Sequence, residues 1–188
     1  MRKDFGAKAV VTPLPVLIIA TYDEKGTPNA MNVAWGGQCG PKHIALNLGK
    51  HKTNENLKAT NAFTVSFATV NDVVASDYFG IASGNVVPDK VAKAQMHTHK
   101  SAHVNAPIID EYPLTLECKV VEMVETSLGE IRVVGEVVNM SADESVLDAA
   151  GNVDLGKVRP ISFDSASNAY RVLGEKVGNA FSDGKKLK

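Results

Sequence analysis

The sequence predicts a mostly β protein, a closed, Greek-key-like antiparallel barrel of about seven or eight strands decorated by two to four short helices. β-branched and apolar residues alternate along most of the periodic segments, and turn-forming residues separate them. Strands never alternate strictly with helices, as a parallel βαβ sheet would require. A length of 188 residues suits one domain, so we expect residues 1–188 to form a single domain.

The first quarter of the chain is expected to form a meander. A buried strand over 16–21 precedes a hairpin turn at 23–26, and the chain returns as a strand over 29–34. A glycine-rich loop over 36–40 then leads to a strand over 43–48.

The second quarter is expected to pair a helix with a strand and then to form another helix. Thr53 caps a short helix over 53–58, and a strand with alternating apolar residues covers 63–67. A helix over 73–79 is expected to end at Gly80.

The second half is expected to begin with a loop region and to end in strands. Residues 81–105 are polar and lack a steady period, with one short helix near 90–95. The expected strands are 114–124 and 131–140, joined as a hairpin, and then 158–163 and 169–172.

Charge and composition argue against several classes of partner. Twenty basic and twenty-one acidic residues give a net charge of −1, so no overall field attracts nucleic acid or anionic lipid. No apolar stretch approaches the roughly 20 residues of a membrane span.

The two cysteines, Cys39 and Cys118, lie far apart in the sequence, as expected of a reduced cytoplasmic protein. Cys118 belongs to an alternating apolar strand, whereas Cys39 faces either solvent or a ligand.

A phosphate site is one interpretation of Lys50, His51, Lys52, Thr53 and Asn54. The sequence has neither a Gly-x-Gly-x-x-Gly nor a P-loop fingerprint, so a nucleotide would have to be held in another way. These five residues stand where a strand gives way to a helix, whose free N–H groups and positive end favour a phosphate. Ordinary surface chemistry before a helix is the alternative.

Two further clusters have the composition of a ligand site. Two asparagines, several small residues and the only tryptophan fall within residues 29–37, where small side chains would let a planar ligand approach the backbone. An ordinary strand with a core tryptophan is the alternative. The segment 76–80, followed by Ser83 and Gly84, places aromatic residues beside small ones, which also suits simple packing.

These clusters together resemble the flavin reductase-like FMN-binding split barrels, in particular the flavoredoxin branch, over nearly the whole chain. The matching features are Pro13-x-Pro15-Val16, Thr21-x-Asp23-x-x-Gly26-x-Pro28-Asn29-Ala30-Met31, Val33-Ala34-Trp35, Lys52-Thr53-x-x-Asn56, Asp77-Tyr78-Phe79-Gly80 with Ser83-Gly84, and Leu173-Gly174-Glu175-x-Val177-Gly178. Each fragment alone is common, and their order and spacing carry the resemblance.

The resemblance implies a homodimer that holds FMN near the subunit boundary. Residues of the 29–35 segment would line the isoalloxazine ring, with Asn29, Met31, Asn32, Val33, Ala34 and Trp35 as the candidates. The phosphate would lie at Lys50, His51, Lys52, Thr53, Asn54 and Asn56. Tyr78, Phe79, Gly80, Ser83 and Gly84 would close over the ring or ribityl chain.

The implied activity is that of a flavin-dependent oxidoreductase. The protein would act as a flavin reductase that accepts hydride from NADH or NADPH, or as a flavoredoxin-like carrier that exchanges electrons with another redox protein. No catalytic acid or base is required of the chain. An FMN-binding dimer without enzymatic activity is the alternative, since fold similarity does not fix a reaction.

Three of the five histidines form a separate cluster at His97, His99 and His103. Such spacing can bind zinc or another transition metal, which would make the chain a metal-binding protein. A solvent-exposed loop without a bound metal is the alternative. A third is that His99 or His103 faces the flavin and controls access to it.

Overall fold

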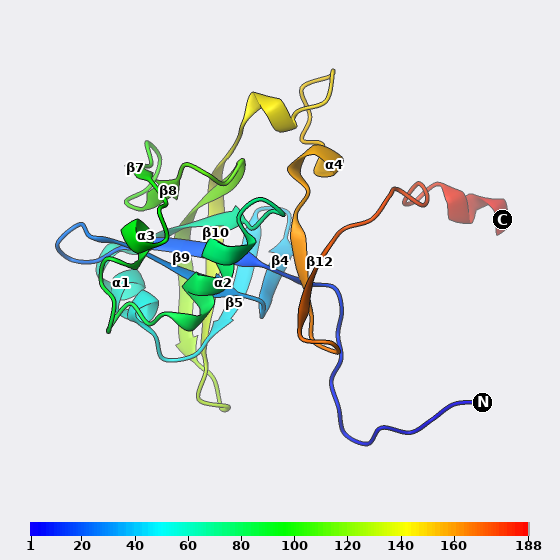
Figure 1. Cartoon of the computed structure of the whole chain (residues 1–188), viewed down its shortest axis with the longest axis horizontal. Coiled ribbons are helices and arrows are strands. Elements are labelled where there is room, and N and C mark those ends of the chain that lie inside the picture. The colour runs from blue at the N-terminus through cyan, green and yellow to red at the C-terminus, as the bar shows by residue number, and fades with distance from the viewer. Residues whose placement is uncertain (188) are drawn as a thin grey trace.

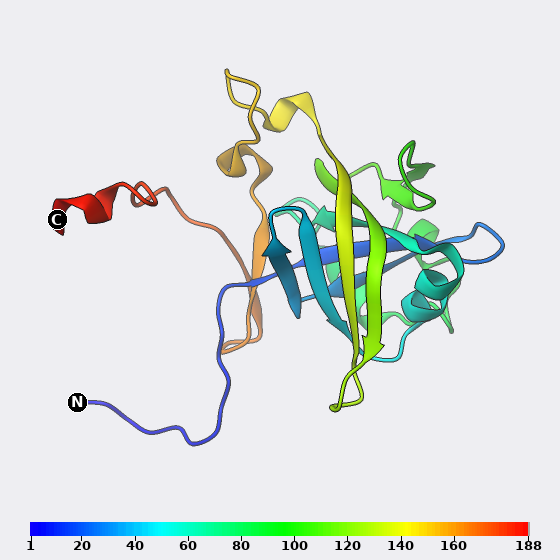
Figure 2. The same cartoon turned by 180° about the vertical axis from the view of Figure 1, so that it is seen from behind.

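In the computed structural model, which describes residues 1–187, seven antiparallel strands form one curled sheet in the order β3-β2-β6-β9-β10-β5-β4 (Figures 1 and 2). The strands are β2 Leu17–Tyr22, β3 Pro28–Val33, β4 Gly36–Gly40, β5 His43–Leu48, β6 Ala62–Phe67, β9 Leu114–Glu125 and β10 Ile131–Ala142. This mostly β, antiparallel architecture confirms the predicted fold class.

The barrel is split between its two edge strands. β3 and β4 are the edges of the sheet, yet they follow each other in the chain with only Ala34 and Trp35 between them. Within residues 1–187 no ladder joins β3 to β4. The hydrogen-bonded sheet of the described residues is therefore open along this seam, and the expectation of a closed ring of strands is wrong in this respect.

Strand β2 is buried on both faces because it separates two apolar cores. Leu17 and Ile19 point into the barrel, where they join the cluster that includes Phe63. Ile18 and Ala20 point outwards into a second cluster that includes Phe79 of α2. This two-sided burial explains why the segment reads as a continuous apolar run and does not alternate.

Short helices cover one end and one face of the barrel. Helix α1 (Lys52–Thr60) packs on β2 and β3, while α2 (Val73–Ile81) and α3 (Lys90–Lys93) pack on β3 (Figure 1). The remaining elements are β1 Leu14–Pro15, β7 Thr98–Lys100, β8 Pro107–Ile109, α4 Leu155–Val158, β11 Ile161–Asp164, β12 Ala169–Val172 and 3₁₀ turns at Glu144–Val146 and Asp183–Leu187. β1, β11 and β12 form a separate small sheet. None of the helices in the described part is long and apolar enough to cross a membrane.

Two predicted loop features are wrong. The glycine-rich segment is not a loop but strand β4, because β5 offers it a partner and a side chain at Gly36 would come within 2.7 Å of the Leu46 side chain. Part of the irregular middle segment also forms a ladder, in which β7 pairs with β8.

Three helix boundaries also differ from the prediction. The N-cap of α1 is His51, which makes no side-chain capping bond, so Thr53 lies inside the helix. Helix α2 continues through Gly80 and ends at Ile81. The start of the strand expected over 158–163 is occupied by the end of α4.

Both ends of the chain extend away from the barrel. Residues 1–13 and 173–187 are almost entirely exposed, and Figures 1 and 2 show them leaving the same side of the body. Apolar side chains such as Phe5, Val177 and Phe181 are exposed along these ends.

Candidate functional site

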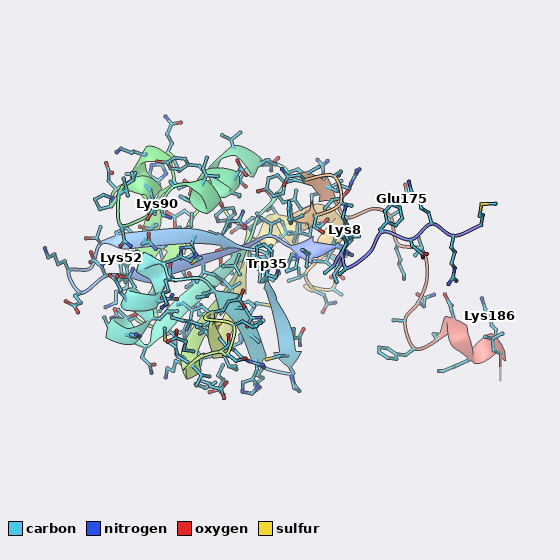
Figure 3. All side chains as sticks on the ribbon, turned by 90° about the horizontal axis from the view of Figure 1, so that it is seen from below. Lys8, Trp35, Lys52, Lys90, Glu175 and Lys186 are labelled. Carbon is cyan, nitrogen blue, oxygen red and sulfur yellow. The ribbon has the colours of Figure 1, made fainter. Side chains whose placement is uncertain are left out.

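Residues from each of the three sequence clusters meet at one cavity of 170 Å³. It lies between edge strand β3, the first turn of α1, and the end of α2 with the loop that follows it. Its lining residues are Asn29, Met31, Asn32, His51, Lys52, Thr53, Phe79, Gly80, Ile81, Ala82, Ser83, Gly84 and Lys90. In Figure 3, Lys52 and Lys90 lie at the same end of the molecule.

The start of α1 supplies positive character to one wall. The first N–H groups of a helix have no intrahelical acceptor, and His51, Lys52 and Thr53 bring this end to the cavity. Lys52 donates to Glu55 at 2.9 Å, and this hydrogen bond raises the pKa of Lys52. The wall therefore combines free backbone donors with a lysine that already has a carboxylate partner.

Asn29 leaves an unpaired acceptor at the cavity wall. Its Nδ2 donates to Thr53 Oγ1 at 3.1 Å, which fixes the amide orientation, while Oδ1 has no partner. The side chain belongs to a residue only 6% exposed. A buried acceptor without a donor costs stability, so the position suits a ligand that donates a hydrogen bond.

Gly84 keeps this end of the cavity open. A Cβ atom built on Gly84 would collide with Asn29 Oδ1 and would stand 3.3 Å from Lys52 Cβ. A larger residue here would fill space that the cavity needs.

The opposite wall, α2, is held by hydrogen bonds from three other parts of the fold. Asn32 Nδ2 donates to Ser76 O at 3.0 Å, and Tyr112 Oη lies 2.8 Å from Ser76 Oγ. Tyr170 Oη donates to Asp77 Oδ1 at 2.8 Å. Burial raises the pKa values of both tyrosines, so both hydroxyls stay protonated. Tyr170 is the donor to Asp77, whereas either hydroxyl of the Tyr112–Ser76 pair can donate to the other.

Lys90 is one of three lining residues that sequence analysis missed. It is 2% exposed, and its Nζ donates to Ala82 O at 2.8 Å and to Phe79 O at 3.4 Å. Burial lowers the pKa of Lys90 to about 8. Ile81 and Ala82 were missed as well. No local signal marks Lys90, because a lysine in a polar segment resembles any surface lysine.

Ten of the seventeen predicted site residues line the cavity, and seven do not. Those outside it are Val33, Ala34, Trp35, Lys50, Asn54, Asn56 and Tyr78. Asn56 Nδ2 donates to Thr21 Oγ1 at 3.0 Å and ties α1 to β2, and Asn54 Nδ2 donates to Gly49 O at 2.6 Å. Trp35 is 66% exposed, so the interpretation of it as a core residue is wrong.

His97, His99 and His103 do not form a cluster of metal ligands in the described part of the chain. His97 Nδ1 lies 2.7 Å from Glu111 Oε1, and His99 Nδ1 lies 2.5 Å from Asp110 Oδ1. The pairing of β7 with β8 brings the Asp110 and Glu111 carboxylates beside the histidines. The part of the chain covered by the structure contains no group of three or more His, Cys, Asp or Glu residues arranged to hold a metal ion.

The chain matches a known family over most of its length. The family model for the flavin reductase like domain matches residues 10–161. The structure of flavoredoxin from Desulfovibrio vulgaris (Miyazaki F) superimposes with a TM-score of 0.92 at 35% identity, over 98% of this chain and 100% of that one. Flavoredoxin from Methanosarcina acetivorans gives a TM-score of 0.89 at 26% identity over all of both chains.

A more distant structure shares the fold alone. The 2-nitrobenzoate 2-nitroreductase of Pseudomonas fluorescens has a TM-score of 0.80 at 19% identity, covering 90% of this chain and 85% of that one. At this identity the resemblance shows a common architecture and gives no information on the reaction.

Proposed function

The chain belongs to the flavin reductase-like domain family, and from that premise we propose that it binds FMN non-covalently in the 170 Å³ cavity and passes electrons through it. The observation that carries the proposal is the convergence of three separate sequence clusters on this one cavity. The flavin, when bound, supplies the redox chemistry, and the protein supplies binding, orientation and shielding from water.

The chemistry of the lining residues fits a flavin nucleotide. The free N–H groups at the start of α1, with Lys52 and the Thr53 hydroxyl, are donors suited to a phosphate. The unpaired Asn29 Oδ1 is an acceptor suited to a ribityl hydroxyl or a ring N–H. The missing side chain at Gly84 leaves room for these contacts.

We propose further that a second copy of the chain completes the site. Ligand pockets generally measure about 300–1,000 Å³, so a cavity of 170 Å³ covers only part of a flavin nucleotide. Exposed apolar side chains on the extended ends and at Trp35 offer surface for a homodimer. Sedimentation equilibrium should give twice the chain mass, and a monomer that binds FMN tightly would contradict the dimer.

The first experiment is the absorption spectrum of the purified protein, with identification of the released chromophore by mass. We expect bands of oxidised flavin and release of FMN. A colourless protein that also fails to bind added FMN would refute the proposed function.

The electron donor separates the two proposed roles. Oxidation of NADH or NADPH that depends on bound FMN supports a flavin reductase, with the pyridine nucleotide as a transient partner. Reduction by a redox protein but not by NADH or NADPH supports a flavoredoxin-like carrier. Photoreduction without any accepted donor supports an FMN-binding protein without enzymatic activity.

A separate variant tests the histidines. Unchanged turnover in a His99→Ala, His103→Ala protein would show that these two residues do not control access to the flavin.

A further inference from the structure

A second cavity lies on the outer face of the barrel sheet. It measures 400 Å³, within the range of about 300–1,000 Å³ that is usual for ligand pockets. The start of β9 and the end of β10 form its floor, and the β7–β8 segment forms a wall. It shares no lining residue with the 170 Å³ cavity, so it is a separate site.

The alternation of side chains along β9 places a carboxylate on this floor. Leu116 and Cys118 belong to the core cluster inside the barrel. Glu117, between them, therefore lies on the other face of the strand, where it lines the cavity. A shift in the register of β10 between Val137 and Asn139 brings Asn139 directly opposite Glu117. An amide donor thus stands beside the carboxylate.

Glu117 is only 1% exposed, and both of its carboxylate oxygens accept hydrogen bonds. The donors are Ser101 Oγ and Asn139 Nδ2. Ser101 Oγ already accepts from the backbone N–H groups of His103 and Val104, both at 2.9 Å. Its own proton is therefore directed to Glu117. A carboxyl group that accepts at both oxygens is in its ionised form, so Glu117 is a buried anion.

No basic side chain within residues 1–187 compensates this charge. The ion pairs of this part of the chain do not include Glu117. Of the basic residues around the cavity, His99 is paired with Asp110. Lys100 and His103 are exposed and lie beyond the 4.0 Å of an ion pair with Glu117. Because a buried charge is costly without an opposite charge, a bound cation would stabilise this site.

We propose that this cavity binds a small molecule with a primary alkylammonium group, whose charge pairs with Glu117. An ammonium group has three donors, and both the remaining lone pairs of Glu117 and the amide oxygen of Asn139 can accept from it. The apolar side chains of Ile108 and Pro113 line the same cavity and suit the alkyl chain. The described residues contain no group of three metal ligands, which favours an organic cation over a metal ion.

The alternative role for Glu117 is structural. Through Ser101 it ties the segment after β7 to β9, and through Asn139 it ties β9 to β10. This role requires acceptors but no charge, so a neutral glutamine would serve it in part. A cation site, in contrast, depends on the negative charge itself.

The experiment is a titration of the isotope-labelled protein, as purified, with n-pentylammonium, followed by amide chemical shifts. The neutral probe of the same chain length is 1-pentanol. We expect n-pentylammonium to shift the amides of Glu117 and Asn139 and to bind roughly tenfold more tightly than 1-pentanol. Glu117→Gln should remove this preference for the cation.

Two further variants complete the experiment. Glu122→Gln is the matched control, because Glu122 lies on the same strand but is exposed and outside the cavity. It should retain the preference. Ser141→Leu fills the cavity from an exposed position on the same face of β10 as Asn139, so it should abolish the binding of both probes. This variant keeps the proposal testable if Glu117→Gln folds poorly.

Three results would overturn the proposal. The first is a wild-type protein in which n-pentylammonium causes no shifts or binds no better than 1-pentanol. The second is a Glu117→Gln protein that keeps the preference. The third is binding that appears only when the protein is diluted below the concentration of self-association, because a lysine side chain of a second copy would then be the natural occupant. None of these results depends on FMN, because the two cavities share no residue.

Discussion

Gly84→Ala tests whether the cavity beside Asn29 is the flavin site. The new methyl group would overlap Asn29 Oδ1 and stand 3.3 Å from Lys52 Cβ, and Asn29 cannot swing away without losing its bond to Thr53. Overpacking of a tight site costs about 1–3 kcal/mol. If that cost falls on the bound state, FMN affinity decreases roughly fivefold to 150-fold.

Quenching of FMN fluorescence during titration with protein measures this loss directly. Gly37→Ala is the matched control, because a Cβ there meets no atom within 4 Å and Gly37 lies outside the cavity. We expect its affinity to equal that of the wild-type protein. An unchanged affinity in Gly84→Ala, with the fold intact by circular dichroism, would refute the assignment of the ligand to this cavity.

Three further predictions concern charge and packing. Lys52→Ala should lower the affinity for FMN only a few-fold, and the affinity for riboflavin less, because an ion pair of a partly exposed lysine contributes about 0.2–1 kcal/mol. An equal loss of affinity in titrations of the two flavins would contradict the phosphate assignment. Gly135→Ala should lower the free energy of unfolding by about 1–3 kcal/mol in urea denaturation, because the added Cβ would stand 2.7 Å from Phe63 Cε1 inside the barrel; an unchanged midpoint would show that the ring can move. In the ligand-free protein, the contribution of Lys90 to the free energy of unfolding should increase as the pH rises from 8 to 10.5. Over this range the unfolded chain binds more protons at Lys90 than the folded chain does. The same pH series on Lys90→Met should lack this increase.

The sequence predicted the parts of the fold whose signal is local. Strands β5 and β12 coincide with the predicted 43–48 and 169–172, because β-branched or apolar alternation and turn residues mark them directly. Strand β4 was missed because glycine has a low intrinsic preference for strands, and only β5 makes the close approach at Gly36 favourable.

The same reasoning explains the error at Gly80. Glycine usually ends a helix, but here a Cβ would stand 3.4 Å from Asn32 Cβ, so the small residue allows α2 to pack closely on β3. That contact joins segments far apart in the chain and leaves no trace in the local sequence.

The candidate site also contains residues with a local sequence signal and residues whose role arises only from long-range packing. Lys52 and Thr53 were predicted because helix-start chemistry is contained in adjacent residues. Lys90 was not, because its burial arises only when α3 packs on β3. The histidines gained carboxylate neighbours in the same way, through the unforeseen pairing of β7 with β8.

Strand β3 has one hydrogen-bonded neighbour, β2, and within residues 1–187 no strand on its other side. Such an edge is a template on which another chain can add a strand and begin to aggregate. Asn29 and Met31 of this edge line the cavity, so a flat ligand bound there would lie against the unpaired edge, where another strand could otherwise add. The proposed ligand would then protect this edge against strand addition and aggregation, in addition to its proposed role in electron transfer.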